Sequence, residues 1–195
     1  MRKHTSFVSS YSSSNIDGNT DPYRDCTYNS SNHPQTPLSE SSSFISCTFT
    51  SLASETRGGA LEFTAGGSNE IVDCIFTHCS SSISIDNDYG GGAVFSNSGS
   101  LLSVSSSAFI SCTTKSVGGD LFCISGCESA AVSGCFFFGC SSESSGGGMC
   151  THYGPICTVS STVFTLCTAE WSGGGIYHNS LSDASDISIS DSLFK

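Results

Sequence analysis

Phe76-Thr77-His78-Cys79 and Gly91-Gly92-Ala93-Val94 form one copy of a motif pair that recurs along this chain. The first half is Phe-x-x-Cys, and the second is Gly-Gly, any residue, then an apolar or aromatic side chain. The first half occurs at Phe44–Cys47, Phe76–Cys79, Phe109–Cys112, Phe137–Cys140 and Phe164–Cys167. The glycine pairs are Gly58-Gly59, Gly91-Gly92, Gly118-Gly119, Gly147-Gly148 and Gly174-Gly175. A motif that recurs about every thirty residues predicts stacked repeats, not a globule around one central site.

The residues between the motifs predict short strands. The position five residues before the motif phenylalanine holds Ile71, Val104, Val132, Val159 and Ile189. Small and β-branched residues that alternate around such positions are typical of strands, with two or three per repeat. Consecutive repeats then pair in parallel, about 4.8 Å apart, with equivalent residues stacked. We therefore expect an all-β fold over residues 37–195, a parallel β-helix (solenoid) of about five rungs plus a partial sixth.

The corners and loops of this solenoid can also be anticipated. We expect the glycine pairs where the backbone takes a positive φ or packs closely. The motif phenylalanines, together with Phe194, are expected to stack in one interior column. The segments from Thr48 to Arg57 and from Ser80 to Gly90 are longer than their later counterparts. We expect loops there to project sideways and to carry binding variation.

The two ends of the chain depart from the repeat pattern. Residues 1–36 are rich in Ser and Asn and show no apolar periodicity, so we expect a disordered or capping arm. The chain stops at Phe194-Lys195, before the cysteine of that motif. A solenoid that ends inside a rung leaves an open sheet edge. We therefore expect this chain to be a truncated part of a longer protein with further rungs.

The composition disfavours several kinds of partner. The formal net charge is −11, and the six Lys and Arg residues share no repeat column. Nucleic acid requires a basic track and an anionic membrane surface attracts basic segments, so we expect neither as a partner. No apolar run reaches the roughly eighteen residues of a membrane helix, so we expect no transmembrane segment. No apolar stretch follows Arg2-Lys3, and no signal peptide is visible.

The alternation of Gly-Gly-Ala-[Ile/Leu/Val] with Phe-x-x-[Asn/Cys] resembles the repeats of the polymorphic membrane proteins, and more broadly the right-handed β-helix, pectin lyase-like group. The resemblance covers about residues 38–195. It implies a right-handed coil and, in the polymorphic membrane proteins, a surface-displayed or secreted passenger used in adhesion. Cys replaces the family's usual Asn in all five complete Phe-x-x blocks.

The twelve cysteines allow more than one interpretation. Those of the repeat column act either as a small apolar filler at a corner or as part of an oxidised extracellular ladder. Stacked Cβ atoms would lie nearly 4.8 Å apart, beyond the ~3.8 Å mean of a disulfide, which favours the filler. A disulfide or two among Cys123, Cys127, Cys150 and Cys157 remains open. Zinc is disfavoured because the chain contains no Cys-x-x-Cys pair.

Residues suited to catalysis do not converge in the sequence. A uronate lyase needs a base such as Arg57 or Lys115 beside Ca²⁺-binding carboxylates, yet these two lie in different columns. Glycoside hydrolysis needs two carboxylates about 5–9.5 Å apart, and the repeat after Asp73 offers Ser106. Asp120 stands in an otherwise apolar column, and we expect it to be an outward turn residue.

Three further groups have ordinary explanations. Asn19-Thr20-Asp21 matches a polygalacturonase motif by letter but lacks the companion motifs of those enzymes. Asp86-Asn87-Asp88 has the chemistry of a Ca²⁺ ligand set, although a solvated loop tip is the simpler interpretation. His78, His152 and His178 fall in three separate columns. We therefore assign no catalytic, cofactor-binding or metal-binding residue and expect no cofactor.

These patterns predict a non-catalytic, surface-displayed or secreted repeat protein that adheres to or binds glycans or cell-surface proteins. The expected location is extracellular or at the cell surface. A carbohydrate-active enzyme, similar to a pectate lyase or polygalacturonase, is the alternative, and a purely structural stalk is a third. An enzyme would bring acidic and basic residues together on adjacent rungs, whereas a display protein would not.

Overall fold

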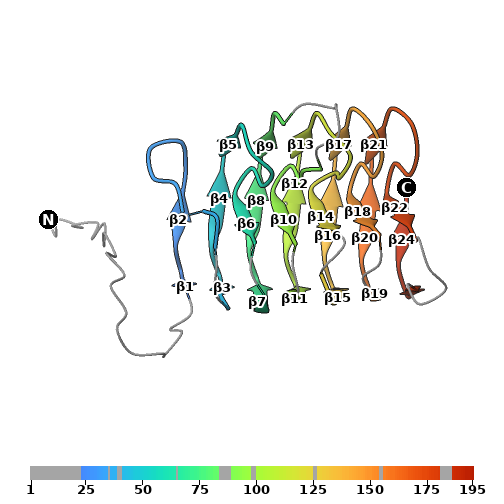
Figure 1. The fold of residues 1–195 in the computed structure, drawn as a ribbon, viewed down its shortest axis with the longest axis horizontal. Coiled ribbons are helices and arrows are strands. Elements are labelled where there is room, and N and C mark those ends of the chain that lie inside the picture. The colour runs from blue at the N-terminus through green and yellow to red at the C-terminus, as the bar shows by residue number, and fades with distance from the viewer. Residues whose placement is uncertain are drawn as a thin grey trace, which may run out of the picture.

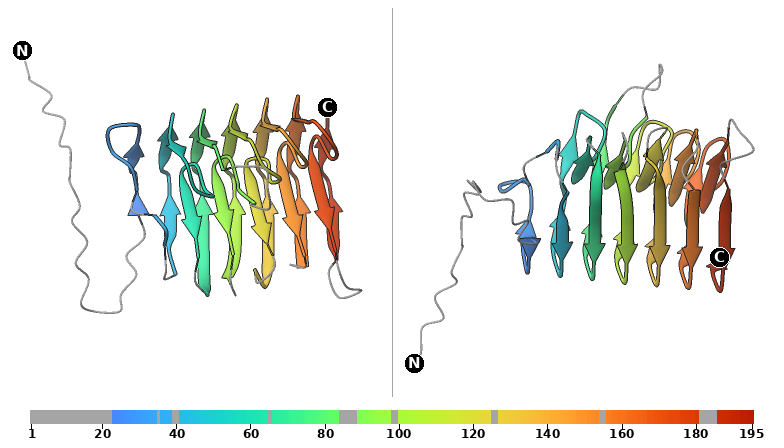
Figure 2. Two further views of the ribbon diagram at one scale, coloured as in Figure 1. Left: turned by 45° about the horizontal axis from the view of Figure 1, so that its top comes forward. Right: turned by 60° about the horizontal axis from the view of Figure 1, so that its bottom comes forward.

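The computed structural model describes residues 23–34, 36–38, 41–64, 66–83, 89–97, 100–124, 127–153, 156–180 and 186–195. All regular elements in these ranges are strands, and they pair in parallel as a β-solenoid with successive rungs side by side (Figure 1). Four sheets run along the stack, and we name them A to D in the order in which the chain visits them (Figure 2).

Sheets A and B are the longer pair, with seven strands each. Sheet A consists of β1 (Tyr23–Arg24), β3 (Ser43–Ile45), β7 (Gly67–Val72), β11 (Ser100–Ser105), β15 (Ser129–Ser133), β19 (Ile156–Ser160) and β23 (Ile187–Ser190). Sheet B consists of β2 (Thr27–Tyr28), β4 (Thr48–Thr50), β8 (Ile75–Thr77), β12 (Ala108–Ile110), β16 (Phe136–Phe138), β20 (Val163–Thr165) and β24 (Leu193–Phe194).

Sheets C and D have five strands each. Sheet C consists of β5 (Ala53–Ser54), β9 (Ser80–Ser81), β13 (Thr113–Thr114), β17 (Ser141–Ser142) and β21 (Thr168–Ala169). Sheet D consists of β6 (Leu61–Phe63), β10 (Val94–Ser96), β14 (Leu121–Ile124), β18 (Met149–His152) and β22 (Ile176–Asn179). The two-residue strands of sheet C are too short to leave a sequence pattern, so a complete rung has four strands where two or three were expected.

The predicted solenoid is confirmed. Five rungs in the described part of the chain contain a strand of every sheet, and β23 and β24 begin a further one. Strands β1 and β2 also pair with β3 and β4, so residues 23–28 form an ordered partial rung within the predicted arm of residues 1–36. Residues 1–22 of that arm lie outside the described residues.

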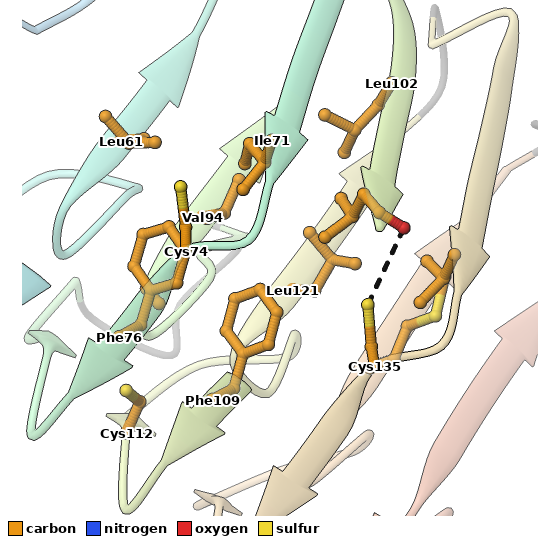
Figure 3. Close-up of a cluster of buried hydrophobic side chains, with 14 of the residues drawn as sticks. Leu61, Ile71, Cys74, Phe76, Val94, Leu102, Phe109, Cys112, Leu121 and Cys135 are labelled. Atoms are coloured by element: carbon orange, nitrogen blue, oxygen red, sulfur yellow. Dashed lines mark hydrogen bonds between the residues drawn. The ribbon is translucent and has the colours of Figure 1, made fainter. Parts of the chain in front are cut away.

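Stacked aromatic rings fill the interior beside sheet B. The six phenylalanines of the column are Phe49, Phe76, Phe109, Phe137, Phe164 and Phe194, with ring centroids 4.5–5.0 Å apart, and Tyr28 stacks on Phe49 at 5.2 Å. Each neighbouring pair contributes about 0.5–1.5 kcal/mol beyond the burial of its apolar area. Ile71 of sheet A lies in the same core beside Phe76 (Figure 3), and Val104 is its Cα partner on the next rung. The six phenylalanines are as predicted except for the first, which is Phe49 and not Phe44.

The first repeat is shifted by five residues from the predicted alignment. Phe49 is the Cα partner of Phe76, whereas Phe44 pairs with Ile71 in sheet A. Cys47 accordingly donates its backbone N–H to the Cys74 thiol and does not stack on Cys79. The assignment of Phe44 and Cys47 to the motif column is therefore wrong, because the true copy is Phe49-Thr50-Ser51-Leu52, in which the buried Leu52 replaces the motif cysteine.

The last two glycine pairs are shifted by one residue. Met149 pairs with Leu121, and Ile176 pairs with Met149, so these two continue the inward column of sheet D. Cys150 and Tyr177, which the motif alignment placed in that column, lie one position further along the strands. A run of three glycines in each of these repeats explains the ambiguity.

Both reasons expected for the glycine pairs occur. A Cβ atom on Gly92 would lie 2.7 Å from the carbonyl oxygen of Thr113, so the close approach of neighbouring rungs excludes a side chain there. Gly119 has a φ of 48°, in the left-handed region that favours glycine. The glycines therefore let the chain cross tightly from sheet C to sheet D.

Candidate functional site

Loops that join sheets C and D cover part of the outer face of sheet D. The outward column of this sheet is Glu62, Phe95, Phe122, Cys150 and Tyr177. Its three central members are buried, and Tyr89 and Val117 from the loops pack against them. Loop residues thus pack on the outer face of sheet D, and loops fixed on a regular scaffold commonly form binding sites.

Buried hydroxyl groups of sheet C anchor these loops. Each hydroxyl donates to a carbonyl oxygen of the loop on the preceding rung. The bonds run from Ser81 to Thr56 (2.6 Å), from Thr114 to Gly90 (3.2 Å) and from Ser142 to Ser116 (2.8 Å). The loops are therefore fixed to the regular part of the solenoid at equivalent points.

A surface hollow of about 460 Å³ lies at the first complete rung, on the loop-covered side. It is lined by Thr36, Pro37, Glu55, Thr56, Arg57, Glu62 and Ile83. The segment before β3 contributes because Leu38 exchanges backbone hydrogen bonds with sheet D, to the Glu62 carbonyl oxygen (2.7 Å) and from the Thr64 N–H (3.0 Å). Residues distant in sequence thus meet in one depression.

The polar groups of the hollow are held in place. The Thr56 hydroxyl donates to Oε2 of Glu62 (3.2 Å), and the Thr56 N–H donates to the Ser54 hydroxyl (3.0 Å). The guanidinium carbon of Arg57 lies 5.3 Å from the centre of the Phe95 ring, within the range of a cation–π contact. Glu55 is exposed, whereas Glu62 is largely buried. The site offers acceptors, a hydroxyl and a cation within one small area.

Sequence reasoning identified part of this site. The loop predicted from Thr48 to Arg57 contains β4 and β5, and its last residues, Glu55 to Arg57, line the hollow. From the second predicted loop Ile83 also lines it. Glu62 was missed, although a charged residue in a column otherwise aromatic or apolar was a usable signal. Thr36 and Pro37 had no such signal, because a long-range backbone contact brings them there.

The corner between sheets A and B is built from thiols and hydroxyls that make equivalent hydrogen bonds. The column is Cys47, Cys74, Ser107, Cys135, Thr162 and Ser192. The Cys74 thiol donates to the Val72 carbonyl oxygen (3.3 Å) and accepts the Cys47 N–H (3.4 Å). The Ser107 hydroxyl does the same one rung later. Figure 3 shows the equivalent Cys135 thiol, 3.6 Å from the Val104 carbonyl oxygen.

The corner between sheets B and C carries the remaining motif cysteines. Cys79, Cys112, Cys140 and Cys167 are fully or largely buried there, in the interior core. All twelve cysteines of the chain are free thiols. The thiols of this corner also donate to backbone carbonyl oxygens, as Cys140 does to Phe109 (3.3 Å), so the cysteines of both corners, Cys47 included, are more than apolar fillers.

Asp120 is buried, so the expectation of an outward turn residue is wrong. Its neighbours in the column are Ala93 and Gly148, with the Asp120 N–H bonded to the Gly148 carbonyl oxygen (3.0 Å). Neither carboxyl oxygen has a hydrogen-bond partner among the described residues. Burial raises the pKa of this carboxyl well above its usual value, and the Cys140 thiol acts more weakly in the opposite direction. The side chain faces the thiols of the interior, not the hollow.

The other residues considered for catalysis are dispersed. Asp73 and His78 both have a φ of 53° and form turns, where Asp73 accepts the Ser46 hydroxyl (3.3 Å). His152 contacts Asn179 (2.9 Å), and burial lowers the pKa of His152. Asn19–Asp21 and Asp86–Asp88 lie outside the described residues. In the part of the chain that is described, no three His, Cys, Asp or Glu side chains are arranged to hold a metal ion.

A second surface feature lies on the outer face of sheet B. Ile75, Phe136, Phe138 and Leu193 are each more than a third exposed on this face. The rings of Phe136 and Phe138 stack at 5.9 Å. Apolar side chains gathered on a flat sheet face are suited to contact with another macromolecule.

Comparison with known proteins gives no relative from which a function can be transferred. No protein-family model matches the chain, and neither does any curated protein or solved structure. None of the described residues belongs to a helix capable of crossing a lipid bilayer.

Proposed function

We propose that this protein is a non-catalytic, surface-displayed or secreted β-solenoid that binds glycans through the hollow beside sheet D. The observation that carries the proposal is the meeting of Glu55, Thr56, Arg57 and Glu62 in one depression of about 460 Å³. Small-ligand sites combine a concave surface with a few placed polar groups, and sugar hydroxyls both donate and accept hydrogen bonds. The carboxylates accept hydrogen bonds from sugar hydroxyls, and the guanidinium donates hydrogen bonds to sugar oxygens.

The charge of the protein narrows the class of glycan. A net charge of −11 repels polyanions such as uronic acid polymers. Two of the three charged side chains in the hollow are acidic. We therefore infer neutral or amino sugars as the ligands, with Arg57 donating to hydroxyl or ring oxygens.

The repeat motifs support the wider setting of this proposal. Gly-Gly-Ala and Phe-x-x-Cys, alternating along a solenoid, resemble the repeats of the polymorphic membrane proteins within the pectin lyase-like group. A surface adhesin with a right-handed coil is what that resemblance implies. The apolar outer face of sheet B offers an area for protein contact that suits adhesion.

Glycan binding is tested with an immobilised panel of neutral, amino and acidic sugars. Arg57→Ala should weaken binding to the recognised sugar by about tenfold or more, because hydrogen bonds to charged groups contribute roughly 1.5–3 kcal/mol. Lys115→Ala is the matched control, since it removes a cation on a later rung that does not line the hollow. Equal affinity of Arg57→Ala and the unaltered protein, or no binding to any sugar, would reject the proposal.

A carbohydrate-active enzyme is the second candidate, because Glu55 and Glu62 line the same hollow with Arg57. Glycosidases use two carboxylates that flank the scissile bond. Release of reducing ends from a polysaccharide, lost in both Glu55→Gln and Glu62→Gln while binding persists, would replace the binding proposal with catalysis.

A further inference from the structure

The imidazole of His152 is buried on the outer face of sheet D with one ring nitrogen unpaired. His152 is the last residue of β18 and is 6% exposed. Its Nε2 lies 2.9 Å from the side-chain nitrogen of Asn179 on the next rung. Nδ1 is buried and has no hydrogen-bond partner within the described ranges. A buried polar atom without a partner is uncommon in proteins and requires an explanation.

Two tyrosine rings contact this imidazole. The ring centroid of Tyr153 lies 3.7 Å from that of His152, and the ring centroid of Tyr89 lies 4.6 Å from it. The two tyrosine rings also meet edge to face at 6.3 Å. Both tyrosines are partly exposed. The buried imidazole is thus packed against side chains that themselves reach the surface.

Tyr89 connects the imidazole with the hollow. Its ring stacks on Phe122 at 5.6 Å, and Phe122 stacks in turn on Phe95 at 5.6 Å. The Phe95 ring lies 5.3 Å from the guanidinium carbon of Arg57, which lines the hollow. The residue after Tyr89 is Gly90, where an added Cβ atom would lie 3.0 Å from the Arg57 carbonyl oxygen. A displacement of Tyr89 therefore alters the support of a side chain in the site.

The groups around the imidazole do not balance a positive charge. Its contacts are the phenol rings of Tyr89, before β10, and Tyr153, after β18, and the amide of Asn179 in β22. The Cys150 thiol, two residues earlier on β18, stays neutral because burial raises its pKa. Strand β14, on the other side of β18, contains no charged residue. A proton on His152 would thus create an uncompensated charge.

Protonation therefore disfavours the packed arrangement. Both nitrogens of an imidazolium are donors, and Nδ1 has no acceptor here. Burial lowers the pKa of His152 from its ordinary value of 6.5. An imidazole released into solvent regains that ordinary value. The packed arrangement is therefore fully favoured above about pH 6.5 and loses stability as the pH falls below it, until the buried ring also binds a proton.

We propose that His152 is a pH switch that holds Tyr89 against sheet D near neutral pH and releases it in acid. Release of the Tyr89 ring removes the packing of Phe122 and Phe95, on which Arg57 lies. The hollow then binds its ligand near neutral pH and releases it in acidic surroundings. This effect on the ligand rests on the proposed glycan binding, whereas the movement of Tyr89 does not.

The experiment is a pH titration of isotope-labelled histidine and tyrosine rings by nuclear magnetic resonance. Tyr89→Phe and His152→Phe assign the two sets of signals in the unaltered protein. His152 should titrate below the ordinary 6.5. Over the same pH range the Tyr89 ring signals should shift toward those of an exposed tyrosine, because the ring leaves its stack on Phe122.

Two variants separate the switch from general effects of acid. His152→Phe keeps an aromatic ring but cannot bind a proton, so its Tyr89 signals should not move with pH. His78→Gln is the matched control, because it removes a histidine from the turn after β8 and should leave the movement of Tyr89 intact. Affinity for neutral sugars of the glycan panel should fall roughly tenfold from about pH 7.5 to about pH 5.5, except in His152→Phe.

Three outcomes would overturn the proposal. The first is a His152 pKa at or above 6.5, as a cation stabilised by the two tyrosine faces would show. The second is a Tyr89 signal that stays constant while His152 titrates. The third is sugar affinity that falls equally in His152→Phe. If no sugar binds at any pH, glycan binding is rejected, and the ring signals still support or reject the switch.

Discussion

At the scale of single residues, Asp120 places an ionisable carboxyl in a fully buried, largely apolar position. A carboxyl without a hydrogen-bond partner in an apolar interior costs about 1–3 kcal/mol. Its neighbours Ala93 and Gly148 show that the column accepts very small side chains. Replacing the carboxyl by a small apolar side chain should therefore remove this unfavourable burial.

Asp120→Ala should therefore raise the free energy of unfolding at pH 7 by about 1–3 kcal/mol. Burial raises the pKa of the folded-state carboxyl above the unfolded value of about 3.9, so the unfolded chain releases its proton first. The contribution of Asp120 to stability is greatest below about pH 4 and falls as the pH rises. Urea unfolding from pH 4 to pH 8 should show the advantage of the variant growing with pH.

Asp120→Asn separates ionisation from packing, because the side chains are nearly equal in volume. The stability of Asp120→Asn should not change with pH in the way that Asp120 causes, because the amide does not ionise. This variant still buries a polar group without a hydrogen-bond partner. A constant difference between Asp120→Ala and the unaltered protein over the whole pH range would contradict a raised pKa at Asp120.

Leu166 is a second residue in conflict with its position. Its φ is 55°, and its side chain is exposed. A branched residue pays roughly 1–2 kcal/mol in the left-handed region, where asparagine is better tolerated. Leu166→Asn should raise the free energy of unfolding by about 0.5–1 kcal/mol in chemical denaturation. Thr165→Asn, in the extended strand β20, is the control and should not stabilise.

At the scale of the elements, thiols and hydroxyls make the same hydrogen bonds at the corner between sheets A and B. Cys74→Ser should change the free energy of unfolding by less than about 0.5 kcal/mol, because Ser107 makes the same two bonds one rung later. Cys74→Ala loses both bonds and leaves the Cys47 N–H unpaired, which costs about 1–3 kcal/mol. Equal stability of the two variants in urea melts would refute a hydrogen-bonding role for this thiol.

The same elements show how far the sequence determines the fold. The repeat predicted the parallel solenoid and the aromatic column, because stacked equivalent positions repeat the same side-chain type. It misplaced the first repeat, where Phe44 matches the motif but pairs with Ile71, while Phe49 pairs with Phe76 without being followed by the motif cysteine. A local match cannot set the register here, because Leu52 replaces the motif cysteine of the true copy and only the pairing with the next rung identifies it.

The candidate site was less predictable than the fold. The loop that ends at Arg57 was expected to carry binding variation, and its last residues line the hollow. The opposite wall depends on Leu38 adding to the edge of sheet D beside Phe63. That bridge lies outside the repeat, so no periodicity signals it.

At the scale of the whole molecule, stability depends on position along the stack. Phe109 has ring neighbours on both sides and is completely buried, whereas Phe194 stacks on one ring and is 48% exposed. Phe109→Ala should cost about 3–5 kcal/mol, as expected for a buried phenylalanine, and Phe194→Ala should cost less than half as much. If both substitutions lower the free energy of unfolding in guanidinium equally, stability does not depend on how many neighbouring rungs a phenylalanine contacts.

The anchoring hydroxyls of Ser81, Thr114 and Ser142 have a consequence for engineering and divergence. Each hydroxyl bonds to one backbone carbonyl oxygen in the loop of the preceding rung, and this bond does not depend on the side chains of that loop. Loop length and composition are therefore free to change while the attachment stays constant. The solenoid is in this sense a grafting scaffold, in which recognition segments can be exchanged rung by rung without disturbing the aromatic column beneath them.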